Sequence, residues 1–110
     1  MFGNNISKVE KLIAKKKGDE LVKFTADKDS AVRLKAVEGL GKVGGEAAFH
    51  GLITLLRSAE PSMRQAAANA LGEMGDAKSR AHIEHQLKGE QDAQVAAAMR
   101  EALGKIKDKL

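Results

Sequence analysis

The sequence contains no cysteine, no tryptophan and no tyrosine. The missing cysteine excludes disulfide bonds and thiolate metal sites, so the fold does not depend on the redox state of its compartment. Three phenylalanines are the only aromatic residues, and the core therefore has to be built from aliphatic side chains, as in packed helices. No apolar run approaches the ~18 residues of a membrane span, and the N-terminus has no signal-peptide pattern, so we expect a cytoplasmic protein.

The sequence also lacks any stretch in which polar and apolar residues alternate periodically, so we expect no sheet. One motif instead occurs three times, beginning at Val32, Met63 and Val95, at spacings of 31 and 32 residues. Each copy has Leu-Gly at its ninth and tenth positions and an aliphatic residue at its twelfth. A repeat of this length is typical of stacked helical arrays.

Hydrophobic spacing and helix-end residues predict seven helices. Ser7 and Glu10 have the spacing of a capping box, and Gly18 is expected to end the first helix. Asp29, Asp76 and Asp92 are expected to cap later helices, and Pro61 fits a first helical position. The expected ranges are 7–16, 19–26, 30–43, 46–57, 61–74, 77–88 and 92 to about 107.

These helices predict an all-α fold: an α-solenoid of about three antiparallel helix pairs with an N-terminal cap helix. We expect one domain over residues 1–110, divided into a cap helix (1–17), repeat 1 (18–44), repeat 2 (45–75), and repeat 3 with a C-terminal cap (76–110). The third repeat is the most polar, and Arg100 replaces Val37 and Ala68 in register. An uncovered outer side needs such residues, so we expect a complete array.

The glycines of the repeated Leu-Gly pair, Gly41, Gly72 and Gly104, recur at one register. Glycine destabilises a helix interior, and its recurrence therefore indicates close contact between neighbouring helices.

Two segments, 29–41 and 60–72, resemble the short HEAT-like repeat of the phycobilisome-lyase type. That pattern reads acid, often proline, then Val-Arg, an alanine-rich run and Leu-Gly. The resemblance covers about residues 19–106 and implies an α-solenoid. It also implies ion pairs between repeats, from Arg33 to Glu60 and from Arg64 to Asp92. Related bilin lyases bind a large chromophore, and the resemblance therefore keeps a bilin-lyase-like subunit as a less favoured alternative, although we find no candidate bilin site in the sequence.

No nucleophile elbow, phosphate loop or dinucleotide fingerprint occurs, so we expect a protein that is not an enzyme and needs no cofactor. The sharpest polar constellation is His50, His82 and His85, because His50 precedes His82 by 32 residues. These imidazoles could bind a metal ion, although ordinary surface histidines are the favoured interpretation, and we assign no metal site.

The exposed face of the second helix in each pair is the expected binding surface. We expect a scaffold module, monomeric or weakly oligomeric and away from membranes, that binds a protein or peptide partner there. Residues 1–44 carry ten Lys and Arg against six Asp and Glu, and residues 45–110 carry nine of each, so nucleic-acid or anion binding by the basic half is the alternative. The expected partner-binding residues are Leu34, Lys35, Glu38, Lys42, Gln65, Asn69, Glu73, Ala97, Glu101 and Lys105.

Overall fold

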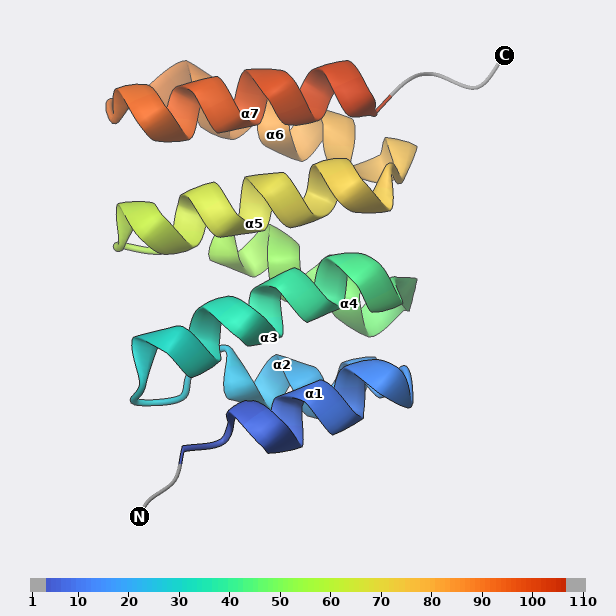
Figure 1. The fold of residues 1–110 in the computed structure, drawn as a ribbon. Helices are drawn as coiled ribbons and strands as arrows, with labels where there is room; N and C mark the ends of the chain where they lie inside the picture. The colour runs from blue at the N-terminus through green and yellow to red at the C-terminus, as the bar shows by residue number, and fades with distance from the viewer. Residues whose placement is uncertain (1–3, 107–110) are drawn as a thin grey trace.

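The computed structural model describes residues 4–106, which form seven α-helices and one short 3₁₀ turn and contain no strand. Figure 1 shows them as a stack of two layers, with α1, α3, α5 and α7 in an inner layer and α2, α4 and α6 behind them. The first and last helices, α1 and α7, lie at opposite ends of the stack (Figure 1). The helices are α1 (Ile6–Ala14), α2 (Gly18–Phe24), α3 (Ser30–Val43), α4 (Gly45–Leu55), α5 (Pro61–Met74), α6 (Arg80–Gly89) and α7 (Ala93–Lys105), and the 3₁₀ turn is Ala77–Ser79.

This arrangement confirms the predicted α-solenoid. The pairs α2–α3, α4–α5 and α6–α7 stack in chain order, and α1 covers the free side of α3 (Figure 1). A Cβ atom added at Gly39 of α3 would lie 2.5 Å from the Ile13 side chain of α1. The cap helix therefore occupies the place that a preceding inner helix would take.

Most predicted helix starts are confirmed. The Asp29 carboxylate accepts a hydrogen bond from the Ala31 amide at 2.9 Å, and the Asp92 carboxylate accepts from the amides of Gln94 and Val95. Asp76 caps the 3₁₀ turn that precedes α6, rather than α6 itself. Pro61 is the first residue of α5.

The first helix differs from its prediction at both ends. Ser7 lies inside α1 and caps nothing, because the helix already begins at Ile6, whose amide donates to the Asn4 side chain. Gly18 does not end α1 but is the buried first residue of α2. The turn is made instead by Lys16, whose φ of 57° lets the amides of Lys16 and Lys17 bond back to the carbonyls of the last helical turn.

Other helix ends differ by only a few residues. α4 begins at Gly45 and ends at Leu55, and α6 ends at Gly89. α7 ends at Lys105, whereas its predicted last residue, Lys107, and the predicted C-terminal cap lie at or beyond the end of the described residues.

One aliphatic core runs between the two layers. The outer helices fill it with large side chains such as Leu21, Leu52 and Ile83. The inner helices contribute many small ones, including Ala36, Ala67 and others. Arg100 of α7 is exposed, as expected for the outer side of the last repeat.

The inner helices approach one another through glycine and alanine. A Cβ atom added at Gly41 would lie 3.0 Å from the Cα and carbonyl oxygen of Ala70, and one added at Gly72 would lie 3.1 Å from the Cα of Ala102. The same register thus gives the α3–α5 and α5–α7 contacts, as the recurring glycine predicted. Gly104, at the end of the array, has nothing within 4 Å of an added Cβ.

We therefore expect Gly41→Val to lower the free energy of unfolding by ~1–3 kcal/mol, because the new side chain meets the α5 backbone, which cannot rotate away. Gly104→Val is the matched control and is expected to leave stability unchanged or to raise it slightly, because its site is open. Urea unfolding followed by circular dichroism compares the two. Equal destabilisation by both variants would contradict the close α3–α5 contact.

Candidate partner-binding surface

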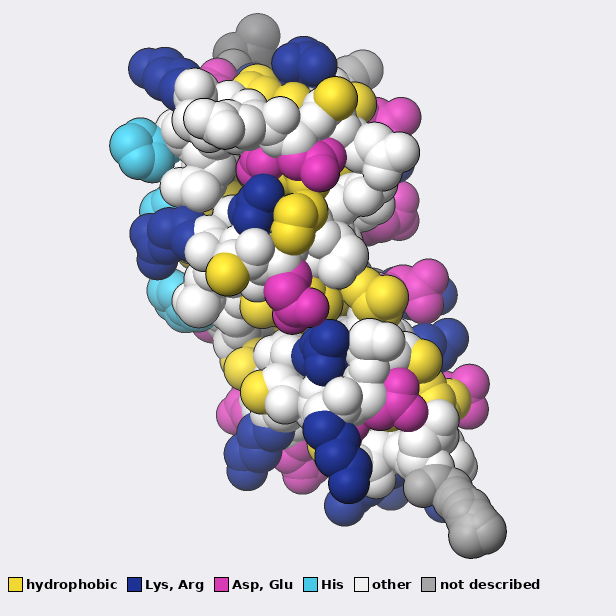
Figure 2. Space-filling model, turned by 90° about the vertical axis from the view of Figure 1, so that its left-hand side faces the viewer, with side chains coloured by type: hydrophobic (Ala, Val, Ile, Leu, Met, Phe, Trp, Pro, Cys, Tyr) yellow, Lys and Arg dark blue, Asp and Glu magenta, His cyan; other side chains and the backbone are white. Residues whose placement is uncertain are grey.

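The exposed sides of α3, α5 and α7 form one continuous surface, which we call the inner face. The three helices run side by side in the same direction (Figure 1). Residues four apart on each helix therefore point the same way, as Leu34, Glu38 and Lys42 do on α3. In profile, the outline of the molecule is indented on the side of the inner layer, at the level of α3 and α5 (Figure 2).

Two depressions adjoin on the inner face. The first, of about 400 Å³, lies between α3 and α5 and includes Ala66 and Ala70. The second, of about 430 Å³, lies between α5 and α7 and includes Ala97 and Ala98. Asn69 lines both. Small side chains thus leave two shallow troughs on either side of α5.

Side-chain amides lie along these troughs. Gln65, Asn69 and Gln94 have no side-chain hydrogen bond to any of residues 4–106. Each amide offers a donor and an acceptor. The inner face therefore presents hydrogen-bonding groups that protein contacts leave open.

Charges on the inner face are mostly paired. The Lys35 ammonium lies 3.5 Å from the Glu38 carboxylate, and Lys105 lies 3.5 Å from Glu73. Leu34 adds an apolar element: at 40% exposure, it is the one large hydrophobic side chain that is exposed in the described part of the chain.

The structure brings all ten predicted partner-binding residues to this face. Eight line the depressions, and the other two, Lys35 and Lys105, pair with lining carboxylates. Sequence reasoning missed Ala66, Ala70, Gln94 and Ala98. Each lies three residues, about one helical turn, before a predicted residue, as Gln94 does before Ala97, and this spacing is the signal that could have found them. The binding role of these residues stays a prediction.

An ion pair fastens the second repeat to the third. The Arg64 guanidinium donates to both carboxylate oxygens of Glu90, at 2.8 and 2.9 Å, and also to the Ser58 carbonyl oxygen. The Glu90 side chain is only 4% exposed. The Arg64 hydrogen bond is the main reason that the pKa of Glu90 lies below its usual value.

The expected partner of Arg64 was wrong. Asp92 already caps α7, and Glu90, two residues earlier in the loop between α6 and α7, pairs with Arg64 instead. The tie between Arg33 and Glu60 is confirmed but looser, at 3.6 Å with Glu60 58% exposed. Arg33 Nε is buried without a hydrogen-bond partner among the described residues.

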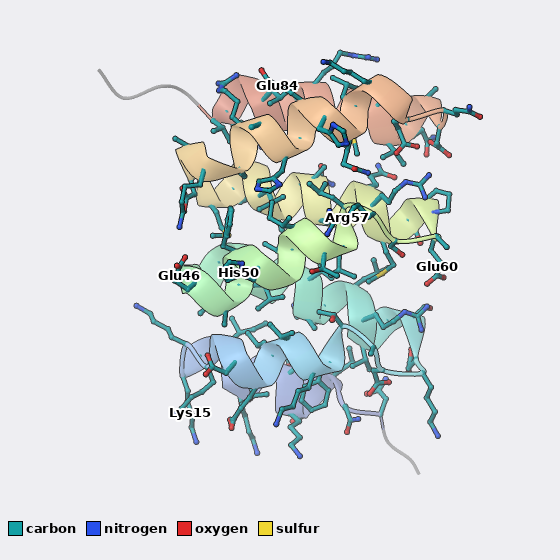
Figure 3. The ribbon with its side chains drawn as sticks, turned by 180° about the vertical axis from the view of Figure 1, so that it is seen from behind. Lys15, Glu46, His50, Arg57, Glu60 and Glu84 are labelled. Atoms are coloured by element: carbon teal, nitrogen blue, oxygen red, sulfur yellow. The ribbon has the colours of Figure 1, made fainter. Side chains whose placement is uncertain are left out.

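The structure does not gather the three histidines into one cluster. No group of three His, Asp or Glu side chains within residues 4–106 is placed to hold a metal ion. His50, labelled on α4 in Figure 3, and His82 instead pack edge-on against the Phe49 ring, at centroid distances of 5.4 and 6.0 Å. Buried positions align α4 and α6 at an offset of 31 residues, as with Leu52 and Ile83, so Ala81 and not His82 matches His50.

Comparison with known families decides the identity of the fold. A family model of HEAT repeats matches residues 18–104. The chain belongs to the HEAT-repeat family. HEAT repeats generally mediate protein–protein interactions. The match is to HEAT repeats as a class, and the likeness to the phycobilisome-lyase type stays a prediction.

Comparison with curated proteins found none that matches the HEAT-repeat chain. Within residues 4–106, no helix is both long and apolar enough to cross a membrane.

We expect Glu90→Gln to lower the free energy of unfolding at neutral pH by ~1–3 kcal/mol, because it removes the charge from a buried, doubly bonded partner of Arg64. Glu60→Gln, which alters the same tie one repeat earlier, is expected to change it by less than ~0.5 kcal/mol, because Glu60 is exposed. Urea unfolding measures both variants. Equal effects would show that burial does not distinguish the two ties.

The pH dependence of this difference has a defined sign. Because the pKa of Glu90 is lowered from 4.5 in the folded protein, its charge contributes stability above that pH, and this contribution is lost as the pH falls through the folded-state pKa. The difference in unfolding free energy between wild type and Glu90→Gln should therefore be largest near neutral pH and shrink as the pH falls below 4.5. Urea unfolding across this range tests it, and a gap that widens in acid would contradict the assignment.

Proposed function

We propose that this HEAT-repeat protein is a non-enzymatic interaction module that binds an extended peptide segment of a partner protein across its inner face. The observation that supports the proposal is the pair of adjoining troughs on either side of α5, with the open amides of Gln65, Asn69 and Gln94 along them. The troughs can hold an extended peptide, and the amides can form hydrogen bonds with its backbone.

An extended backbone carries unpaired N–H and C=O groups at every residue. A side-chain amide can pair with one backbone N–H and one backbone C=O of the peptide. These hydrogen bonds do not depend on the peptide's side chains. Inner helices ~8–10 Å apart place α3 and α7 roughly 16–20 Å apart, which is the length of about six extended residues. A segment of that size crosses both troughs.

Leu34 and the charges supply the selectivity in this proposal. Leu34 lies at the α3 end of the first trough and would pack against one apolar side chain of the peptide. Three carboxylates and three ammonium groups are among the ten residues, so the face has no net charge and does not require a strongly charged partner. We assign no catalytic role to any residue of this face.

The test uses a displayed peptide library selected against the full chain, followed by titration of the selected peptides. We expect Asn69→Arg, which fills the junction of the two troughs, to weaken binding at least ~10-fold. Glu20→Arg, at an exposed position of α2 in the outer layer, is the control and should bind like the wild type. Selected peptides that bind Asn69→Arg as well as wild type would place the site elsewhere.

Nucleic-acid or anion binding by the basic N-terminal half is the second candidate. It is supported by Lys11, Lys15, Lys16 and Lys17, which form no ion pair with any described residue. Lys15 extends away from the stack in Figure 3. Such binding would depend on phosphate contacts, because no Phe, Tyr or Trp side chain is exposed for stacking among the described residues. A filter-binding assay at low salt that retains no oligonucleotide would rule it out.

A further inference from the structure

A third depression lies away from the inner face, at the edge of the stack where α4 and α6 end. Its volume is about 770 Å³, larger than either trough of the inner face. It is lined by Arg57 after α4, by Arg64 in the first turn of α5, and by residues at the end of α6 and in the loop that follows, among them His85, Lys88 and Glu90. Figure 3 shows Arg57 at the end of α4, on the side toward α6.

Positive charge in this edge depression exceeds negative charge. The one carboxylate that lines it, Glu90, is neutralised by the two hydrogen bonds from Arg64 and is almost fully buried. Arg57 and Lys88 are exposed and form no ion pair or side-chain hydrogen bond with any of residues 4–106. Two fixed positive charges therefore remain without a counter-charge, with the exposed imidazole of His85 beside them.

These two cations occupy one register position in adjacent repeats. The offset of 31 residues between α4 and α6 that aligns Leu52 with Ile83 also aligns Arg57 with Lys88. The matching residue of the first repeat is Ala26. At this register, only repeats 2 and 3 both carry a cation, and the two cations line the same depression.

Like charges held near each other in a concave surface raise the local potential and attract an anion. A phosphate monoester carries about two negative charges at neutral pH, which matches the two uncompensated cations. Arginine suits such a group because its planar fork can donate two parallel hydrogen bonds to phosphate oxygens, and lysine adds a point charge.

We propose that the edge depression is a binding site for a phosphate monoester, held by Arg57 and Lys88 with His85 beside them. The site is separate from the inner face, and it does not depend on the peptide-binding proposal. The same chemistry is offered by free phosphate and by a phosphorylated side chain, which the experiment separates.

The experiment is a titration of the full-length chain, followed by amide NMR, with three probes: inorganic phosphate, a phosphoserine peptide and the same peptide unphosphorylated. Saturable shifts are expected at Arg57, Ser58 and the stretch from His85 to Gln91. Arg57→Gln/Lys88→Gln should bind phosphate at least ~10-fold more weakly. Lys23→Gln/Arg100→Gln, which removes the same charge from exposed positions of α2 and α7, should bind like the wild type.

A second variant keeps the charge. Arg57→Lys/Lys88→Arg should retain most of the affinity, and binding as weak as that of the glutamine variant would overturn the charge-based assignment. Tenfold tighter binding of the phosphoserine peptide than of phosphate would indicate a phosphorylated side chain, and equal binding would indicate the free anion.

Two other results would also overturn the proposal. Unchanged phosphate binding by Arg57→Gln/Lys88→Gln, with a lowered melting temperature, would show that these cations only stabilise the C-terminal ends of their helices. Shifts that do not saturate and that spread over the lysines of α1, or tighter binding of a single-stranded oligonucleotide than of either phosphate probe, would replace the site with a diffuse basic surface.

Discussion

The contact of glycine with alanine between neighbouring inner helices is the constraint on which the rest of the structure depends. Gly41 against Ala70 and Gly72 against Ala102 bring α3, α5 and α7 to nearly the same separation. The inner helices contact one another extensively, whereas the outer layer packs through large side chains such as Leu52 and Ile83. Helices with small side chains approach one another more closely than helices with large ones, so the inner side of the stack is shorter than the outer side. The same small side chains do not fill the grooves between the inner helices, which leaves the two troughs.

The ion pairs of Arg33 and Arg64 lie near the N-terminal ends of α3 and α5, away from the glycine contacts. The loops there contain polar groups that need hydrogen-bond partners. Arg64 holds a loop carbonyl and a carboxylate at once, and so fixes the approach of the third repeat to the second. The looser Arg33 tie leaves a buried Nε without a partner among residues 4–106. Because an unsatisfied buried donor is costly, the first junction is less well fastened than the second. Two junctions with one sequence pattern therefore differ in strength.

Most of the fold could be predicted from the sequence because it follows from local chemistry repeated three times. The caps at Asp29 and Asp92 and the start at Pro61 act within one turn of the chain, and the motif register places the glycines. The errors have a different cause. Lys16 adopts a left-handed backbone conformation, which a lysine in the sequence does not indicate. Arg64 pairs with Glu90 because the Asp92 carboxylate already caps α7. Both outcomes depend on which of several neighbouring residues makes a turn or an ion pair. A pattern of residue types does not show which one does.

The candidate sites follow a complementary rule. Buried positions are fixed by stacking, and they therefore repeat, as Leu52 and Ile83 do. Exposed positions can differ between repeats, because stacking does not require the same residue at each of them. Leu34, Gln65 and Ala97 share one register on the inner face, and Ala26, Arg57 and Lys88 share another at the edge. In both series the fold supplies the position and leaves the choice of side chain open. Under the two proposals, the specificity of this array therefore lies in the residues that differ between its repeats.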